Sequence, residues 1–180
     1  MTGESTACFI LAGGRSTRFG SDKAMAPLRG ATLLSGAVAT ARAAGFWPRV
    51  VTRNFAGYAS VIAPFVVAEC AHRGPVEGLR AALTGTRSET ALFLAVDMPD
   101  VTRGMLRGLV DDFPADCHVM CYRSGDRIHP FPGIYRRDPT LGAASDCAAM
   151  RELVSRLTVR FLPAQGDGSL RNVNTPEDLG

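Results

Sequence analysis

The segment LAGGRSTRFGSDK at residues 11–23 decides how the rest of the chain is interpreted. It follows the apolar run ACFIL at residues 7–11, which predicts a short buried β-strand. The strand gives way to Gly13 and Gly14 and then to a polar loop. Glycines have no Cβ, so backbone N–H groups in such a loop can approach phosphate oxygens closely. The order of strand, glycine pair and polar loop therefore indicates a site for a nucleoside triphosphate.

Three basic residues of this loop, Arg15, Arg18 and Lys23, supply positive charge for phosphates. Lys23 is the only lysine among 20 Lys and Arg residues, which favours a specific use of its compact charge. The spacing differs from a P-loop, because no lysine directly follows Gly20, and it differs from G-x-G-x-x-G. The alternative interpretation is an ordinary glycine-rich turn beside a solvated basic surface.

Composition predicts one soluble globular domain over residues 1–180, since 46% of the residues are apolar and 21% are charged. A net charge of +3 without basic runs does not favour binding to nucleic acid. No apolar run approaches the roughly 20 residues that span a membrane, and residues 1–6 lack a signal pattern. We therefore expect a cytoplasmic protein whose five cysteines are reduced. Cys117 and Cys121 lack further ligands at metal-site spacing, so we expect buried thiols.

Strand and helix patterns alternate along the chain. Strands are expected at residues 50–52, 65–68, 91–96, 118–123, 129–135 and 158–162, and helices at residues 33–44, 58–62, 75–83, 101–112 and 146–157. The alternation predicts an α/β fold, a Rossmann-like three-layer α/β/α sandwich with a mostly parallel central sheet.

Asp97 is the candidate metal ligand. It follows the continuously apolar run at residues 91–96, which is typical of a central strand covered on both faces. Ligands of α/β sheets gather at the carboxyl ends of strands, and Mg²⁺ binds one or two carboxylates together with phosphate oxygens and water. Thr52 and Asn54 end another strand and are placed to face the same ligand, although Asn54 alternatively serves as a turn residue. Asp100 is assigned a structural role as an N-cap or turn residue, because the next helix is expected from residue 101.

Two further polar features lie later in the chain. Asn172 and Asn174 are two residues apart in an extended segment, so their side chains face the same side and can bind a metal-bound phosphate or a polar heterocycle. The following Thr175 and Pro176 predict the N-cap and first residue of a helix. His129 precedes a proline at the start of a strand and is either a donor to the substrate or a structural residue.

Several motifs resemble one family. The pattern LAGGxSxRFGxDK at residues 11–23 resembles the nucleotide-binding loop of the molybdenum cofactor guanylyltransferases, which are nucleotidyltransferases of the GT-A type. GPVEGLRAAL at residues 74–83, AVDMPDV at residues 95–101 and NVNTPEDL at residues 172–179 resemble segments of the same family, in the same order. HPFPGIY at residues 129–135 resembles a strand that lines the substrate half of its cleft. The combination spans nearly the whole chain and is far more specific than a glycine pair.

The resemblance implies a reaction in which molybdopterin, or its molybdenum form, attacks the α-phosphorus of GTP with Mg²⁺ present, and pyrophosphate leaves. GTP and molybdopterin are the implied small-molecule substrates, and proteins of molybdenum cofactor biosynthesis or acceptor molybdoenzymes are the implied protein partners. The residues implied in nucleotide binding are Leu11, Ala12, Gly13, Gly14, Arg18, Lys23, Thr52, Asn54, Glu69 and Asp97. Asn172, Asn174 and His129 are implied on the pterin side, and Lys23, Asp97 and Arg18 in catalysis.

Two alternatives stay open from the sequence. The first is a cytidylyltransferase or sugar-phosphate nucleotidyltransferase of the same fold, although LAGG favours guanine because cytidine relatives commonly have LAAG. The second is a non-catalytic protein that binds a nucleotide or cofactor. The presence of both Lys23 and Asp97 favours an enzyme, because binding alone does not require both residues.

Overall fold

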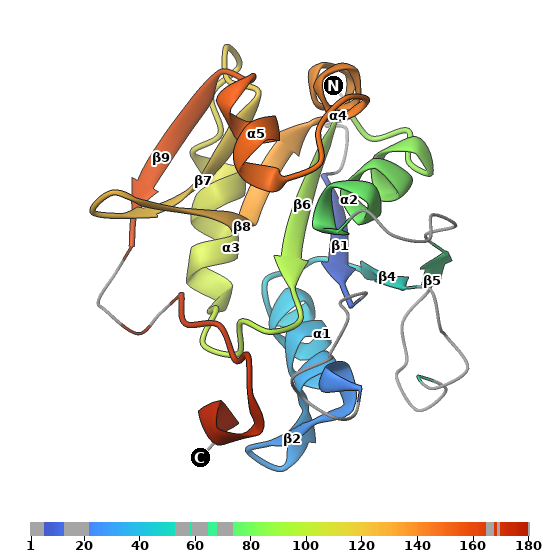
Figure 1. The fold of residues 1–180 in the computed structure, drawn as a ribbon, viewed down its shortest axis with the longest axis vertical. Coiled ribbons are helices and arrows are strands. Elements are labelled where there is room, and N and C mark those ends of the chain that lie inside the picture. The colour runs from blue at the N-terminus through green and yellow to red at the C-terminus, as the bar shows by residue number, and fades with distance from the viewer. Residues whose placement is uncertain are drawn as a thin grey trace.

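The computed structural model describes residues 6–12, 22–52, 58, 65–67, 74–164, 168 and 170–179. A seven-stranded sheet with the order β5-β4-β1-β6-β8-β7-β9 forms the centre of this part (Figure 1). Its strands are β1 (Ala7–Leu11), β4 (Pro48–Thr52), β5 (Phe65–Val67), β6 (Thr90–Ala95), β7 (Val119–Ser124), β8 (Arg127–Arg136) and β9 (Val159–Pro163). Strands β2 (Pro27–Leu28) and β3 (Ala31–Thr32) form a separate hairpin.

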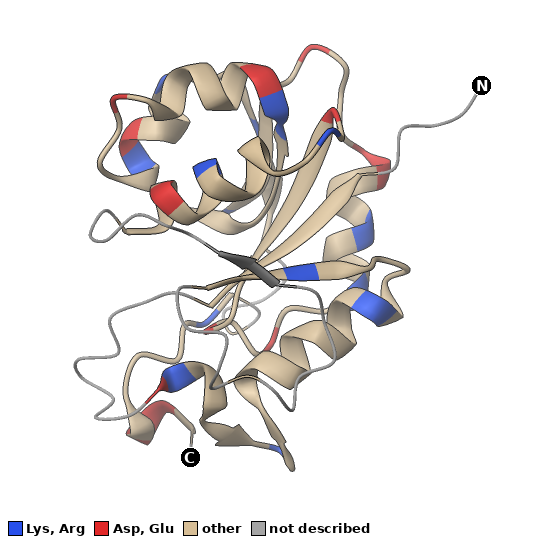
Figure 2. Ribbon diagram, turned by 90° about the vertical axis from the view of Figure 1, so that its right-hand side faces the viewer, with Lys and Arg blue, Asp and Glu red and all other residues tan. Residues whose placement is uncertain are grey.

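Helices cover both faces of the sheet, which lies between two helical layers in Figure 2. The helices are η1 (Lys23–Met25), α1 (Leu33–Ala43), α2 (Gly74–Thr84), α3 (Arg103–Asp111), α4 (Arg137–Ala144), α5 (Met150–Ser155) and η3 (Pro176–Leu179), where η denotes a 3₁₀ helix. Helix α1 contacts α3 on one face, whereas α2, α4 and α5 contact one another on the other face. The predicted three-layer α/β/α sandwich is therefore confirmed.

All strand pairs of the large sheet are parallel except those made by β8, which runs antiparallel to both β6 and β7. The mostly parallel sheet is therefore confirmed as well. Strands β7 and β8 are joined by a tight hairpin, in which Ser124 pairs with Arg127. This hairpin inserts the one antiparallel strand next to β6.

The core is built on the central strands β1 and β6. Phe9 on β1 and Phe93 on β6 are fully buried, and their rings stack with centroids 5.3 Å apart. The ring of Tyr135 on β8 packs edge-on against the ring of Phe93, with the ring centroids 5.6 Å apart. Both faces of these strands are covered by helices, which explains why their sequences are continuously apolar rather than alternating.

Asp100 is predicted to be an N-cap or a turn residue, and only the turn is found, because α3 begins at Arg103 rather than at residue 101. The N-cap of α3 is Thr102, whose hydroxyl oxygen accepts a hydrogen bond from the Met105 N–H at 3.3 Å. Asp100 instead lies in the turn after β6, where its carboxylate pairs with Arg29 and Arg171. Both arginines are distant from Asp100 in the sequence, so the residues around Asp100 do not indicate these ion pairs.

The predicted helix over residues 146–157 is longer than the observed α5. A further helix, α4, precedes it and was not predicted, because Asp138 and Pro139 are typical turn residues. Proline is tolerated in the first turn of a helix, where backbone N–H groups have no partner within the helix. The local composition therefore does not separate a turn from a helix start at this position.

The cysteines that the structure describes are buried free thiols, which confirms the prediction for Cys117 and Cys121. Burial, with a smaller effect from Cys117, raises the pKa of Cys121 to about 12 and keeps that thiol protonated. Within the described ranges, no group of three or more His, Cys, Asp and Glu residues could hold a metal ion. No helix in the same ranges is long and apolar enough to cross a membrane.

We predict opposite effects of alanine at two glycines. A Cβ at Gly133 of β8 would lie 2.5 Å from the Pro130 carbonyl oxygen, whereas a Cβ at Gly142 of α4 would meet nothing within 4 Å. Gly133→Ala should lower the free energy of unfolding by about 1–3 kcal/mol, because the backbone must move. Gly142→Ala should raise it by about 0.5–1 kcal/mol, because alanine favours the helix. Urea unfolding of both variants measures the difference, and a Gly133→Ala protein as stable as the parent would contradict the prediction.

Candidate functional site

The topology of the sheet places the candidate site between β1 and β6. The chain leaves β1 through α1 to reach β4 on one side, and it later returns through α2 to reach β6 on the other side. Ligands of open α/β sheets bind at the carboxyl ends of strands where the direction of winding reverses in this way. Leu11 ends β1 and Asp97 follows β6 at this point, and the Val96 N–H donates to the Leu11 carbonyl oxygen at 3.1 Å.

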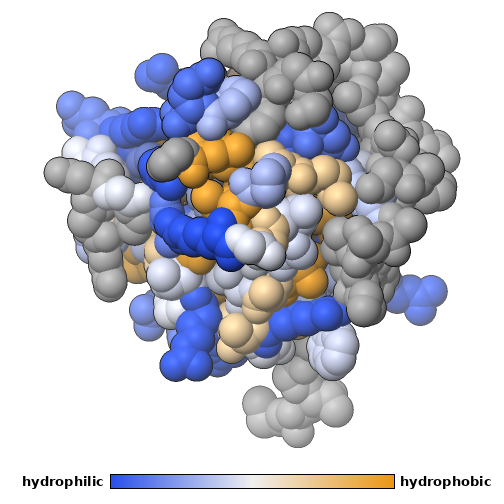
Figure 3. All heavy atoms as spheres, turned by 90° about the horizontal axis from the view of Figure 1, so that it is seen from below, coloured by the Kyte–Doolittle hydropathy of each residue, from blue (hydrophilic) through white to orange (hydrophobic). Residues whose placement is uncertain are grey.

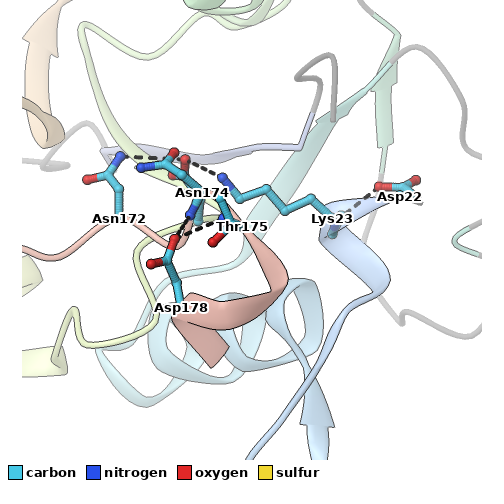
Figure 4. A network of polar contacts seen from close by, with 8 residues as sticks. Asp22, Lys23, Asn172, Asn174, Thr175 and Asp178 are labelled. Atoms are coloured by element: carbon cyan, nitrogen blue, oxygen red, sulfur yellow. Dashed lines mark hydrogen bonds and ion pairs between the residues drawn. The ribbon is translucent and has the colours of Figure 1, made fainter. Parts of the chain in front are cut away.

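Lys23 and Asp97 form an ion pair at this end of the sheet. Lys23 Nζ lies 3.0 Å from Asp97 Oδ2, and the two side chains are 15% and 22% exposed. The helix η1 that carries Lys23 is held by Asp22, whose carboxylate accepts a hydrogen bond from the Ala24 N–H at 3.0 Å. Asn172 Nδ2 lies 3.5 Å from the same Asp97 oxygen, and Figure 4 shows Lys23 and Asn172 pointing toward one another. Three predicted site residues therefore meet, although up to 149 positions separate them in the sequence.

The segment that carries the two asparagines is tied to the turn after β6. The Val173 N–H donates to the Asp97 carbonyl oxygen at 2.8 Å, and the Val173 side chain is fully buried. Asn172 and Asn174 flank this buried residue and therefore face away from the core, as alternation predicts. The Asp178 carboxylate accepts hydrogen bonds from the N–H groups of Asn174 and Thr175 at 2.6 and 2.8 Å, and these bonds lower its pKa.

Tyr58 lies next to the candidate site and was not singled out from the sequence. Its hydroxyl donates to the Ala12 carbonyl oxygen at 3.3 Å, while the Ala12 N–H donates to Val51 at 2.9 Å. Burial, followed by a hydrogen bond with Asp22, raises the pKa of Tyr58 well above its usual value. Ala12 precedes the glycine-rich loop and Asp22 follows it, so a single phenol connects the two ends of that loop. A lone tyrosine outside any motif carries no sequence signal for this role.

Thr52 ends β4, as predicted, but its side chain is only 2% exposed. It also hydrogen-bonds the Tyr58 side chain. As placed, Thr52 can support a ligand by holding Tyr58 rather than by touching the ligand itself. Leu11 is half-buried at the end of β1 beside Gly78 of α2.

Six predicted ligand residues lie outside the residues that the structure describes. They are Gly13, Gly14, Arg15, Arg18, Asn54 and Glu69. Their assignments to the nucleotide stay predictions from the sequence.

His129 lies on the β7–β8 hairpin. Because β8 runs antiparallel to β6, its first residues point toward the carboxyl end of β6 and therefore toward the end of the sheet that carries Asp97. The His129 side chain is buried, and its Nε2 lies 3.3 Å from Ser124 Oγ. Burial, with the nearby charge of Arg127, lowers the pKa of His129, so the imidazole is neutral near pH 7. A neutral ring is a poor partner for phosphate charge, and its contact with Ser124 supports a structural role.

The donor set around Asp97 fits a magnesium ion that is shared with phosphates. It offers the Asp97 carboxylate and, 3.5 Å from it, the side-chain amide of Asn172, whose oxygen is a hard ligand once the amide turns. Mg²⁺ is commonly bound by one or two carboxylates together with substrate phosphates and water. The Asp97 side chain is 22% exposed, so part of its carboxylate is open to solvent. Figure 3 looks onto this end of the molecule, where hydrophilic residues border a central patch with hydrophobic residues.

Residues 8–161 match the family described as MobA-like NTP transferase domain. A probable molybdenum cofactor guanylyltransferase of Opitutus terrae is 32% identical, with 94% of this chain and 90% of the relative covered. The crystal structure of molybdopterin-guanine dinucleotide biosynthesis protein A from Archaeoglobus fulgidus has the same fold (TM-score 0.80, 22% identity, 97% and 95% covered). Rv0371c from Mycobacterium tuberculosis, in complex with manganese, has a TM-score of 0.75 at 26% identity, with 96% and 95% covered.

We predict that the Lys23–Asp97 ion pair is detectable in solution. Lys23 is the only lysine, so reductive methylation with ¹³C-formaldehyde labels one side-chain amine besides the terminal amino group. Asp97→Asn should shift the NMR signal of that amine, because the neutral amide removes the charge 3.0 Å from Nζ. Asp111→Asn removes a carboxylate from the exposed Arg107–Asp111 pair on α3 and serves as the control. A Lys23 signal that responds equally little to both substitutions would show that the ion pair does not form.

Proposed function

The chain belongs to the MobA-like NTP transferase family, and from this premise we propose that it transfers GMP from GTP to molybdopterin or its molybdenum form. The observation that carries the proposal is the convergence of Lys23, Asp97 and Asn172 at the carboxyl ends of β1 and β6. These residues come from three separate motifs, and each supplies a group that suits a triphosphate or its metal. The name of the Opitutus relative supports guanylyl transfer in particular.

The proposed reaction is a direct displacement at phosphorus. An oxygen of the acceptor phosphate forms a bond to the α-phosphorus of GTP, and the bond from that phosphorus to the bridging oxygen breaks. The bonding electrons leave with pyrophosphate, so no enzyme nucleophile and no covalent intermediate are required. The protein then contributes by positioning the two substrates and by offsetting charge.

Lys23 has two partners in this scheme. Without substrate its ammonium group pairs with Asp97, so neither charge is left uncompensated. A triphosphate at the end of β1 offers the ammonium group a second anion, and the lysine stem is long enough to turn toward it. The same movement frees the Asp97 carboxylate for a cation. The ion pair is therefore the resting arrangement of the site rather than a competitor for its function.

Asp97 would hold Mg²⁺, with the amide oxygens of Asn172 and Asn174 nearby. The bound ion would offset charge on the triphosphate and stabilise the charge that develops as pyrophosphate leaves. The manganese in the Rv0371c structure supports a divalent cation in this family. The acceptor would lie on the side of the asparagines, and Tyr58 would hold the loop on the nucleotide side. We place the reaction in the cytoplasm, with molybdenum cofactor biosynthesis proteins or molybdoenzymes as the recipients of the product.

The proposal predicts that Asp97→Asn lowers turnover by roughly a hundredfold or more, because the variant loses the charge that holds the cation. GTP binding measured in EDTA should persist, since the amide keeps the shape of the carboxylate. The tightening of GTP binding by Mg²⁺ should disappear. Calorimetric titration of GTP with and without Mg²⁺ checks this, and Asp111→Asn is the matched control. A full Mg²⁺ effect in Asp97→Asn would place the cation elsewhere.

The proposal also predicts the choice of base. Each of the four nucleoside triphosphates is incubated with Mg²⁺ and molybdopterin, and pyrophosphate release is measured. We expect release with GTP to exceed release with CTP by about tenfold or more, which corresponds to about 1.4 kcal/mol in the transition state. Equal use of CTP would favour the cytidylyltransferase alternative. Tight GTP binding without release from any acceptor tested would favour a binding protein.

A further inference from the structure

We propose that Asp100 is a positioning residue that holds Asn172 beside the Asp97 carboxylate through ion pairs with Arg29 and Arg171. The inference rests on the proposed function, because it concerns how the acceptor side of that site is assembled. It concerns residues that were not assigned to the nucleotide or to the metal ion. We call the group of Asp100, Arg29 and Arg171 the arginine clasp.

The clasp joins three segments that are distant in the sequence. Asp100 Oδ1 lies 2.8 Å from Arg29 Nη2, and Asp100 Oδ2 lies 2.9 Å from Arg171 Nε. Each carboxylate oxygen therefore has its own arginine. Arg29 belongs to the turn of the β2–β3 hairpin, Asp100 to the turn after β6, and Arg171 to the segment that carries the asparagines. Arg171 Nη1 also donates to the Asp178 carbonyl oxygen at 2.7 Å, which extends the connection to η3.

Besides the contact of Asn172 itself, the clasp is one of two attachments between the turn after β6 and the asparagine segment. The other is the hydrogen bond from the Val173 N–H to the Asp97 carbonyl oxygen at 2.8 Å. Arg171 and Val173 flank Asn172, so the two attachments lie on either side of it. With one attachment the segment could rotate about that hydrogen bond, whereas two attachments fix the direction in which the segment runs. Asn172 can then reach the Asp97 carboxylate, 3.5 Å away.

The backbone of Arg29 supports a specific role for its side chain. Arg29 has φ = 54°, in the left-handed region that favours glycine or asparagine, and it is followed by Gly30 with φ = 80°. A turn with two positive φ angles is normally filled by Asn-Gly or Gly-Gly. A residue held in a disfavoured conformation indicates that its surroundings, or its function, require that side chain. Asparagine or glycine would suit this backbone better, but neither could form the ion pair that Arg29 makes with Asp100.

The charges of the clasp persist at neutral pH. Burial on its own, the largest single effect, would raise the pKa of Asp100, but the hydrogen bonds and charges of Arg171 and Arg29 together lower it. The side chains of Arg29 and Arg171 are 66% and 39% exposed, so the pairs add little to global stability. The consequence of the clasp is therefore local. It decides where Asn172 lies, and it leaves the folded core nearly unaffected.

The test uses Asp100→Asn, which keeps the shape and removes the charge, and Arg171→Gln, which breaks the clasp from the other side. Hydrogen exchange at the Val173 amide reports attachment of the segment without reference to activity. We expect exchange there to rise by about tenfold in both variants. In kinetic measurements we expect KM for molybdopterin to rise, or kcat to fall, by about tenfold, while GTP affinity in EDTA stays within about twofold of the parent. Asp111→Asn should change none of these quantities.

The outcomes separate the proposal from the proposed function. Unchanged exchange at Val173 in both variants would falsify the proposal, whether or not the parent protein is active. Faster exchange with unaltered acceptor kinetics would also overturn it, because the clasp would then tether the segment without positioning Asn172. A parent that binds GTP but releases no pyrophosphate with molybdopterin would overturn the proposed function and the positioning role together. In that case the exchange data still decide whether Asp100 holds the segment.

Discussion

The parallel pairing of β1 with β6 is the constraint on which the site depends. The register runs from Ala7 opposite Ala91 to Leu11 opposite Ala95, so both strands end at the same level. The glycine-rich loop therefore starts beside the Asp97 turn, although more than 80 residues of chain lie between them. A shift of this register by one residue would exchange the two faces of a strand and move Phe93 away from its stacking partner Phe9. The aromatic core and the position of the carboxylate are thus fixed by the same contact.

The sequence predicted those parts of the site that depend on local pattern. The position of Asp97 was predicted because a carboxylate directly follows the most apolar strand, and the direction of parallel strands fixes which end of the sheet it occupies. The shared orientation of Asn172 and Asn174 was predicted because alternation places both side chains on one side of an extended segment. The layers of the fold followed from the alternation of strand and helix patterns. Each of these inferences uses only residues that are close to one another in the sequence.

The sequence did not predict contacts that depend on how distant segments pack. Tyr58 connects the two ends of the loop through Ala12 and Asp22, yet no neighbouring residue distinguishes it from any buried tyrosine. For Asp100 the sequence predicted an N-cap or a turn residue, because aspartate before a helical pattern is common in both places. Its arginine partners are 71 residues away in both directions, so its role appears only in the folded chain. Ion pairs have no periodicity, and spacing rules therefore cannot detect them.

The attachment of Asn172 to the turn after β6 also has a consequence for biosynthesis. Ribosomes make a chain from its N-terminus, and a domain generally folds as a unit. The strand, the loop and Lys23 are thus made first, whereas the asparagine segment follows β9 and is the last of these parts to be made. The candidate site can therefore be assembled only after nearly the whole chain has been synthesised. A chain that terminates after β9 would retain the whole central sheet and lack one wall of its site.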